Sequence, residues 1–293
     1  MNWQDRVGVF LFESGSARAA ALFRIAVGSV IVLTGLAVLR DVPFFYGDAG
    51  VAPGALLGDG QRAEHLSLLH RLSSPGAVRV LHSIYLLAAA LTALGLFTRA
   101  ATVGLFVLTL SFRHANPMLA NNAEQLLTIA TFWLMFLDSD RRWSVSAVWR
   151  WKGAHETGDR PWRGCAALRM LQFQCVFMYG VSVLQKLRTG GDWADGTTMF
   201  YFAANVYEWN VPMTWMLDHP FVYRAATYGP IGLECLFPIL VWWRPARPYL
   251  LATMAIFHGV IFYAMGITHY SLAALALLTV FVPLAEEESR DRT

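Results

Sequence analysis

The residue of this sequence best placed to do chemistry is Lys186, a single lysine at the end of a long apolar stretch. Polar side chains precede it at steps of three and four residues, so they share one face of a helix: Gln172, Cys175, Tyr179 and Ser182. Because polar groups are costly in lipid, this face should turn toward protein or water. An amine that loses water there also loses its preference for the charged form. A neutral amine can act as a general base, for example toward a phenolic hydroxyl of a lipid-soluble molecule.

A second polar face has the same spacing on another apolar stretch: Asn121, Glu124, Thr128 and Thr131. We expect the two faces to meet, with Glu124 and Lys186 at similar depth. His258 and Glu234 also fall within apolar stretches, where ionisable residues are functional candidates by default. The sequence therefore predicts a cavity lined by Glu124, Lys186, His258 and Glu234. Trp193, in the polar turn after Lys186, would shape its mouth.

Each of these residues also has a structural interpretation. Lys186 could extend its ammonium to the lipid headgroups, and Glu124 could form an ion pair with Arg113. His258 could hydrogen-bond between helices. The separation of His258 from His269 does not give the i, i+4 spacing of a helical metal site, so we predict no metal.

The composition indicates a membrane protein. Of the 293 residues 56% are hydrophobic and 15% charged, against roughly 25% charged in soluble domains. The formal net charge of +3 does not indicate a nucleic-acid partner. The cysteines lack the spacing of a disulfide framework or a zinc site, and we expect three small buried side chains: Cys165, Cys175 and Cys235. No removable signal peptide is evident at the start.

Apolar segments near the length of a membrane-spanning helix set the expected architecture. We predict about eight spans: residues 20–39, 80–97, 98–112, 122–137, 165–187, 221–243, 248–264 and 267–284. Interfacial helices are expected near residues 3–11 and 193–207. The fold class is therefore all-α, a polytopic transmembrane helix bundle. It would form one integral membrane domain, residues 1–293, without a soluble extra-membrane domain.

Loop charges predict the orientation. The largest basic cluster follows the fourth predicted span, so this loop should be cytoplasmic: Arg141, Arg142, Arg150, Lys152, Arg160 and Arg163. With eight spans both termini are cytoplasmic, and Lys186 lies toward the outer face of a multi-pass protein of the cell membrane. Arg24 would anchor the inner interface.

Several segments resemble a known family. The stretch QKLRTGGDWADGTTM, which contains Lys186, resembles a motif of the vitamin K-dependent gamma-carboxylases. NNAEQLLTIATFWLMFLDSDRRWSV resembles a further region of the same proteins. LFRIAVG, FFYGDAGVAPGALL and HGVIFYAMGITHYS are typical of the broader, bacterial group of HTTM (horizontally transferred transmembrane) domain proteins. The resemblance covers nearly the whole chain.

The resemblance implies a chemistry for Lys186. In those carboxylases the lysine of this motif deprotonates reduced vitamin K. Oxygen then generates a strong base that removes the gamma proton of a protein-bound glutamate, and carbon dioxide traps the carbanion. The implied cofactor is reduced vitamin K or a menaquinone-like quinone. The implied partners are membrane lipids, the quinone and a separate peptide or protein substrate. This chain departs from the pattern at Ala123, where the carboxylases have histidine, and at Gln185, where they commonly have lysine. We also expect it to lack their large extra-membrane domain.

The sequence therefore supports an integral membrane enzyme that uses a reduced quinone, oxygen and a lysine base in an outward-facing cavity. It would be carboxylase-like or a quinone-oxidising lyase or oxygenase. The expected catalytic residues are Lys186, Glu124 and His258. The expected cofactor-binding residues are Asn121, Asn122, Tyr179, Ser182, Trp193 and Glu234. The alternative is a non-catalytic quinone-binding, lipid-binding or membrane assembly protein. A transporter is disfavoured because no inverted repeat is evident.

Overall fold

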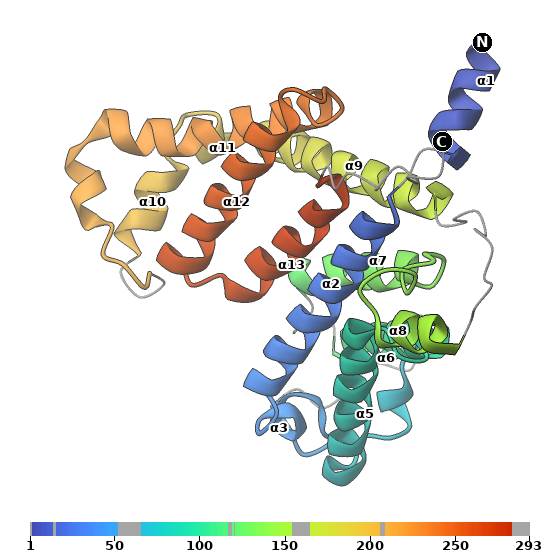
Figure 1. Cartoon of the computed structure of the whole chain (residues 1–293). Helices are drawn as coiled ribbons and strands as arrows, with labels where there is room; N and C mark the ends of the chain where they lie inside the picture. Colours follow the sequence, from blue (N-terminus) through green and yellow to red (C-terminus); the bar gives the residue numbers. More distant parts are fainter. Residues whose placement is uncertain are drawn as a thin grey trace. The chain divides into compact units, whose positions relative to one another are not determined.

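The computed structural model describes residues 2–13, 16–51, 66–116, 119, 121–153, 165–205 and 209–282. All regular structure in these ranges is helical (Figure 1). The chain divides into two compact units, Met1–Met170 with Leu284–Thr293, and Leu171–Pro283. The predicted all-α fold is confirmed for the described residues.

The first unit is built from four long helices. They are α2 (Ala17–Ala37), α5 (Pro75–Leu94), α6 (Thr98–Ala115) and α7 (Asn122–Leu134), with α2 against α5, α5 against α6 and α6 against α7. Short elements complete it: α1 (Trp3–Gly8), the π-helical segment Val9–Glu13, α3 (Val42–Tyr46), the 3-10 turn Leu68–His70 and α8 (Val145–Gly153). Ser16, Ser74 and Asn121 begin α2, α5 and α7, each accepting a backbone N–H. These side chains satisfy donors that a helix start would otherwise leave unpaired.

Close packing of α2 against α5 depends on a glycine. A Cβ on Gly28 would lie 2.8 Å from the carbonyl oxygen of Ala89 and 2.8 Å from the backbone nitrogen of Ala93. Small residues of this kind let helix backbones approach each other in membrane proteins.

Arg24 lies next to this contact and is fully buried. Its guanidinium donates to the carbonyl oxygens of Ser139 at 3.1 Å, Thr92 at 2.7 Å, Ala93 at 2.5 Å and Trp143 at 2.6 Å. The expectation that Arg24 anchors the interface is therefore wrong. The side chain instead joins the end of α5 to the loop after α7, because a planar fork of donors can satisfy several carbonyls at once.

The second unit contains the C-terminal helices. α9 (Cys165–Thr189) enters it at Leu171 and is followed by the 3-10 turn Gly191–Trp193 and α10 (Thr198–Ala204). The 3-10 turn Thr214–Asp218, α11 (Pro220–Leu240), α12 (Arg247–Ala264), α13 (Thr268–Leu278) and the 3-10 turn Thr279–Phe281 come next. α10 packs on α11, α11 on α12 and α12 on α13. Phe237 is fully buried here, with ring centroids 4.5 Å from Tyr179 and 5.6 Å from Phe281.

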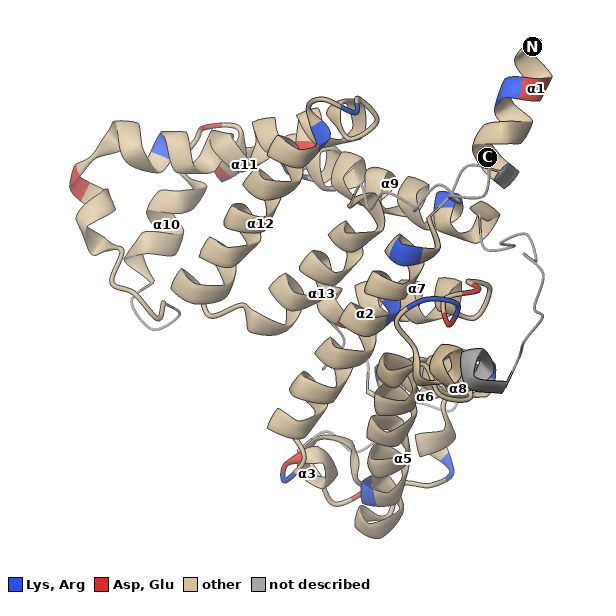
Figure 2. Cartoon of the chain, in the orientation of Figure 1, with Lys and Arg blue, Asp and Glu red and all other residues tan. Residues whose placement is uncertain are grey.

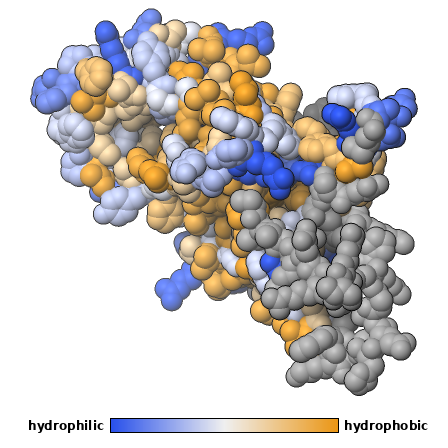
Figure 3. Space-filling view, turned by 45° about the horizontal axis from the view of Figure 1, so that its top comes forward, coloured by the Kyte–Doolittle hydropathy of each residue, from blue (hydrophilic) through white to orange (hydrophobic). Residues whose placement is uncertain are grey.

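The helices have the surface of a membrane protein. Their ribbons are largely free of charged residues (Figure 2), and apolar side chains cover much of the visible surface (Figure 3). Among the described residues, three helices are long and apolar enough to cross a membrane, α2, α5 and α9, the last over Cys165–Arg188. Each of the eight predicted segments coincides with a helix, but the eight-span count stays a prediction.

The cysteines are free thiols, as the sequence indicates, but one differs from its expected environment. Cys165 and Cys175 are buried, whereas Cys235 is exposed. The expectation of three buried side chains is therefore wrong for Cys235, because its side of α11 is not covered within the second unit.

Candidate functional site

The candidate site lies in the second unit and is centred on an ion pair. Lys186, near the end of α9, donates to Oε2 of Glu234 on α11, with 2.5 Å between Nζ and the oxygen. The lysine side chain is 18% exposed and the glutamate side chain 5% exposed. The ammonium therefore binds a nearly buried carboxylate within the unit. This geometry favours a built site over a lysine that extends to the headgroups.

Glu234 lies where α11 is locally weakened. Pro238 is inside the helix, four residues later. Proline has no N–H, so the helix loses the hydrogen bond that would end on the carbonyl oxygen of Glu234. The turn that carries the carboxylate thus has fewer internal constraints than the rest of α11.

A glycine turn brings Trp193 back to Lys186. Gly190 and Gly191 have φ values of 58° and 57°, which ordinary side chains rarely adopt. The chain reverses there, and Nζ of Lys186 lies 5.0 Å from the centroid of the Trp193 ring. A cation at this distance from an indole is attracted by the ring quadrupole. Trp193 therefore packs against the Lys186 ammonium. That it shapes the mouth of a cavity stays a prediction.

Tyr179 and His258 form the second contact of the site. The Tyr179 hydroxyl lies 2.9 Å from Nε2 of His258, and both side chains are buried. Nδ1 of His258 is also buried and has no hydrogen-bond partner in the described part of the chain. A buried polar atom without a partner is uncommon in proteins, and a bound molecule or an ordered water can complete its hydrogen bonding.

The remainder of the polar face of α9 packs inside the same unit. The Gln172 amide donates to the carbonyl oxygen of Val280 at 2.7 Å, and Cys175 Sγ lies 4.0 Å from the carbonyl oxygen of Leu277. Ser182 is half-buried. The predicted packing of this face against protein is confirmed at Gln172, Cys175 and Tyr179, which are buried.

The other predicted residues lie in the first unit, around the start of α7. The Asn121 side chain accepts the Glu124 backbone N–H at 3.2 Å and so caps the helix, while Asn122 is exposed. The half-buried carboxylate of Glu124 accepts from the Tyr46 hydroxyl at 3.4 Å. Arg113 interacts electrostatically with Glu124, but in the described residues no salt bridge joins the two, so a structural pairing stays an alternative.

Tyr46 is a partner that sequence reasoning missed. Burial, together with the nearby Glu124 carboxylate, raises the pKa of Tyr46 well above its usual value. Its ring packs edge-on against Phe112, with 5.2 Å between centroids. Nothing in the sequence signals this pairing, since α3 is short and far from α7 in the chain. The gathering of Glu124 with Lys186 and His258 would join residues of both units and stays a prediction.

Sequence reasoning did not pair Lys186 with Glu234, although it predicted both as site residues. A signal for the pairing existed, because an acid within an apolar helix requires a cation or hydrogen-bond donors nearby. In the described ranges, His, Cys, Asp and Glu form no group of three suited to hold a metal ion.

This geometry defines a class of protein: a helical protein with helices long and apolar enough to cross a membrane. A partly buried lysine lies on a polar face of one of these helices. The family model described as HTTM domain matches residues 17–285. The chain therefore belongs to the HTTM domain family. Neither a curated protein nor a solved structure was found to match it.

Proposed function

We propose that this protein is a carboxylase-related membrane enzyme in which Lys186 is the base that removes a proton from a hydroxyl of a reduced quinone. The observation that carries the proposal is the ion pair of Lys186 with the nearly buried Glu234. The family membership supports a membrane protein of the carboxylase-related kind. The resemblance around Lys186 supports the base.

Glu234 explains how a lysine held in an ion pair can still work as a base. In a poorly solvated site, transfer of one proton from the ammonium to the carboxylate removes two charges at once. The amine becomes neutral while Glu234 holds the proton. Lys186 can then accept the proton of a bound hydroxyl, which restores its positive charge beside the quinone oxygen.

The residues around Lys186 fit an aromatic, hydroxyl-bearing molecule. Trp193 provides a flat apolar surface, and the unpartnered Nδ1 of His258 provides a polar atom for a ring oxygen. Tyr179 fixes the orientation of His258 by its hydrogen bond. A reduced vitamin K- or menaquinone-like quinone would supply electrons to oxygen, which these side chains cannot do. Ser182 is proposed as a further contact, whereas Glu124, Asn121 and Asn122 lie in the first unit and stay predictions.

The substrate beyond the quinone is left as a class. A separate peptide or protein with an accessible glutamate is proposed as the carboxylation substrate. Ala123 and Gln185 replace residues of the carboxylase pattern, so the reaction would proceed without those two side chains. The site would open toward the outer face of the cell membrane, with both termini cytoplasmic.

The test measures oxygen consumption by the purified protein in liposomes supplied with a short-chain menaquinol. We expect Lys186→Ala and Lys186→Arg to abolish turnover, because an arginine keeps the charge but cannot lose its proton. Arg188→Gln is the matched control, since Arg188 is an exposed basic residue two positions further on α9. It should retain the activity of the natural sequence.

Undiminished turnover by folded Lys186→Ala would refute the lysine base. Saturable menaquinol binding without oxygen consumption by the natural sequence would instead support the alternative, a non-catalytic quinone-binding protein.

A further inference from the structure

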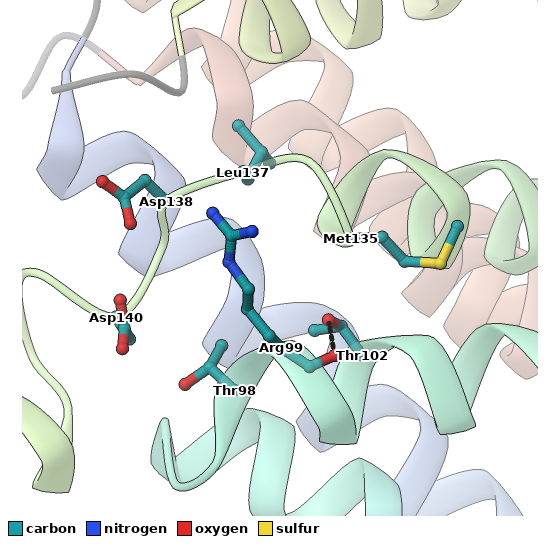
Figure 4. A pocket seen from close by; sticks show the side chains of 7 residues that line it. All are labelled: Thr98, Arg99, Thr102, Met135, Leu137, Asp138 and Asp140. Atoms are coloured by element: carbon teal, nitrogen blue, oxygen red, sulfur yellow. Dashed lines mark hydrogen bonds between the residues drawn. The ribbon is translucent and has the colours of Figure 1, made fainter.

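A second polar site lies in the first unit, where α6 begins. A pocket of about 240 Å³ opens between the start of α6 and the loop that follows α7 (Figure 4). Its polar wall comprises Thr98, Arg99, Thr102, Asp138 and Asp140, and Met135 and Leu137 contribute apolar surface. None of these residues belongs to the site around Lys186.

One half of the pocket is suited to an anion. No side chain caps the start of α6, a helix of 18 residues, so its first backbone N–H groups lack the usual acceptor. Helix starts attract anions through these groups and through the helix dipole. Arg99 lies in the first turn, and within the described residues no carboxylate lies at ion-pair distance from its guanidinium.

An unsatisfied hydroxyl provides the independent sign of a ligand. Thr98 is 7% exposed, its side chain lines the pocket, and its Oγ1 has no hydrogen-bond partner in the described part of the chain. A buried hydroxyl without a partner costs free energy unless a bound molecule or water completes it. A ligand oxygen beside Thr98 and Arg99 would do so.

The other half of the pocket is suited to an amine. Asp138 binds Arg141 at 2.6 Å, and Asp140 interacts electrostatically with the buried Arg24. Both carboxylates line the pocket together with Arg99, and a carboxylate can accept from an ammonium as well as from an arginine. A group with one anionic and one cationic end therefore matches the charged side chains of this pocket.

The position of the pocket points to the membrane surface. α5 is long and apolar enough to cross a membrane and ends at Leu94, four residues before Thr98. Between them, Phe97 is 73% exposed, as aromatic residues often are at the headgroup level. We propose that the pocket binds a phosphoethanolamine group, with the phosphate at Thr98 and Arg99 and the ammonium at Asp138 and Asp140.

The test uses the full-length protein purified in detergent and titrated with dihexanoyl phosphatidylethanolamine. Tryptophan fluorescence reports the affinity and the melting temperature, which a ligand of the folded state raises. Dihexanoyl phosphatidylglycerol tests the need for the amine. Free O-phosphoethanolamine carries the same group without the lipid chains, so its affinity shows whether the pocket takes a soluble ligand or a lipid headgroup. Binding of either ethanolamine compound supports the site.

The variants separate the two halves of the pocket. We expect Arg99→Gln to weaken phosphatidylethanolamine binding about tenfold and Thr98→Val about fivefold. Asp140→Asn should weaken phosphatidylethanolamine binding but not that of phosphatidylglycerol. Arg142→Gln is the matched control, because Arg142 is an exposed arginine of the same loop outside the pocket.

Three results would overturn the proposal: no saturable binding of either ethanolamine compound, equal affinity for both lipids, or an equal loss in Arg99→Gln and Arg142→Gln. A melting curve without ligand identifies any variant that fails to fold, and Asp140→Asn then tests the site independently of the start of α6.

Discussion

The pairing of Lys186 with Glu234 supports a prediction at the scale of single residues. If Glu234 takes the proton of the lysine, Glu234→Gln keeps a hydrogen-bonding partner but removes the proton acceptor. We expect turnover at neutral pH to fall about 10²–10⁴-fold. The measurement is the rate of oxygen consumption with menaquinol.

Undiminished turnover by folded Glu234→Gln would contradict proton acceptance by Glu234. Lys186→Met combined with Glu234→Gln is the control for coupling. The double variant should be no less active than Lys186→Met alone, since residues that act as one unit are not additive.

Arg24 supports a prediction on stability. Its guanidinium serves four backbone carbonyls from a fully buried position. Arg24→Lys keeps the charge but cannot reach them all, so we expect a loss of about 2 kcal/mol or more in unfolding free energy. Thermal or denaturant unfolding in detergent measures it, and Arg142→Lys, at an exposed position, should change little. Equal stability of the two variants would contradict the role assigned to Arg24.

Residue spacing revealed polar faces but not the partners across them. The face of α9 was predictable because Gln172, Tyr179 and Lys186 obey the helical period. Their partners could not be predicted, since hydrogen bonds such as Lys186–Glu234, Tyr46–Glu124 and Arg24–Ser139 join residues 48, 78 and 115 positions apart. No periodicity relates residues at those distances.

Helix positions were predictable because apolar length alone defines them. The boundaries depended on local chemistry that hydropathy ignores. α5 begins at Pro75, five residues before the predicted span, because Ser74 caps it and Arg79 is tolerated on an exposed position. It ends before Gly95, which has a φ of 69°, a typical helix stop.

The contact of α2 with α5 gives a prediction for a helix pair. Gly28→Ala would place a methyl group against backbone atoms of α5 at 2.8 Å, which forces the helices apart. We expect a loss of about 1–3 kcal/mol in unfolding free energy. Gly104→Ala is the matched control, because a Cβ on this glycine of α6 has nothing within 4 Å. That change should stabilise the helix by about 0.5–1 kcal/mol. Similar melting temperatures for both variants would contradict close packing at Gly28.

For the whole molecule, the number of membrane crossings separates two topologies. Length and apolarity single out α2, α5 and α9 among the described helices. The remaining predicted spans are shorter or carry charged residues, such as Glu234 in α11. In a membrane such residues are tolerated when they pair inside the protein, as Glu234 does with Lys186. Hydropathy can therefore undercount the crossings of a protein with an internal polar site, and we expect eight.

Two exposed positions distinguish three membrane crossings from eight. Asp195 follows α9, and Arg244 lies between α11 and α12. If α11 crosses the membrane they lie on opposite sides, with Arg244 cytoplasmic by the positive-inside rule. If only α2, α5 and α9 cross, Asp195 and Arg244 lie on the same side.

Single cysteines at these positions, in a chain whose three native cysteines are replaced, would be treated in intact cells with a membrane-impermeant maleimide. We expect Asp195→Cys to react and Arg244→Cys to react only after the cells are permeabilised. Reaction of both in intact cells, or of neither, would contradict the eight-span topology and with it the outward-facing position of Lys186.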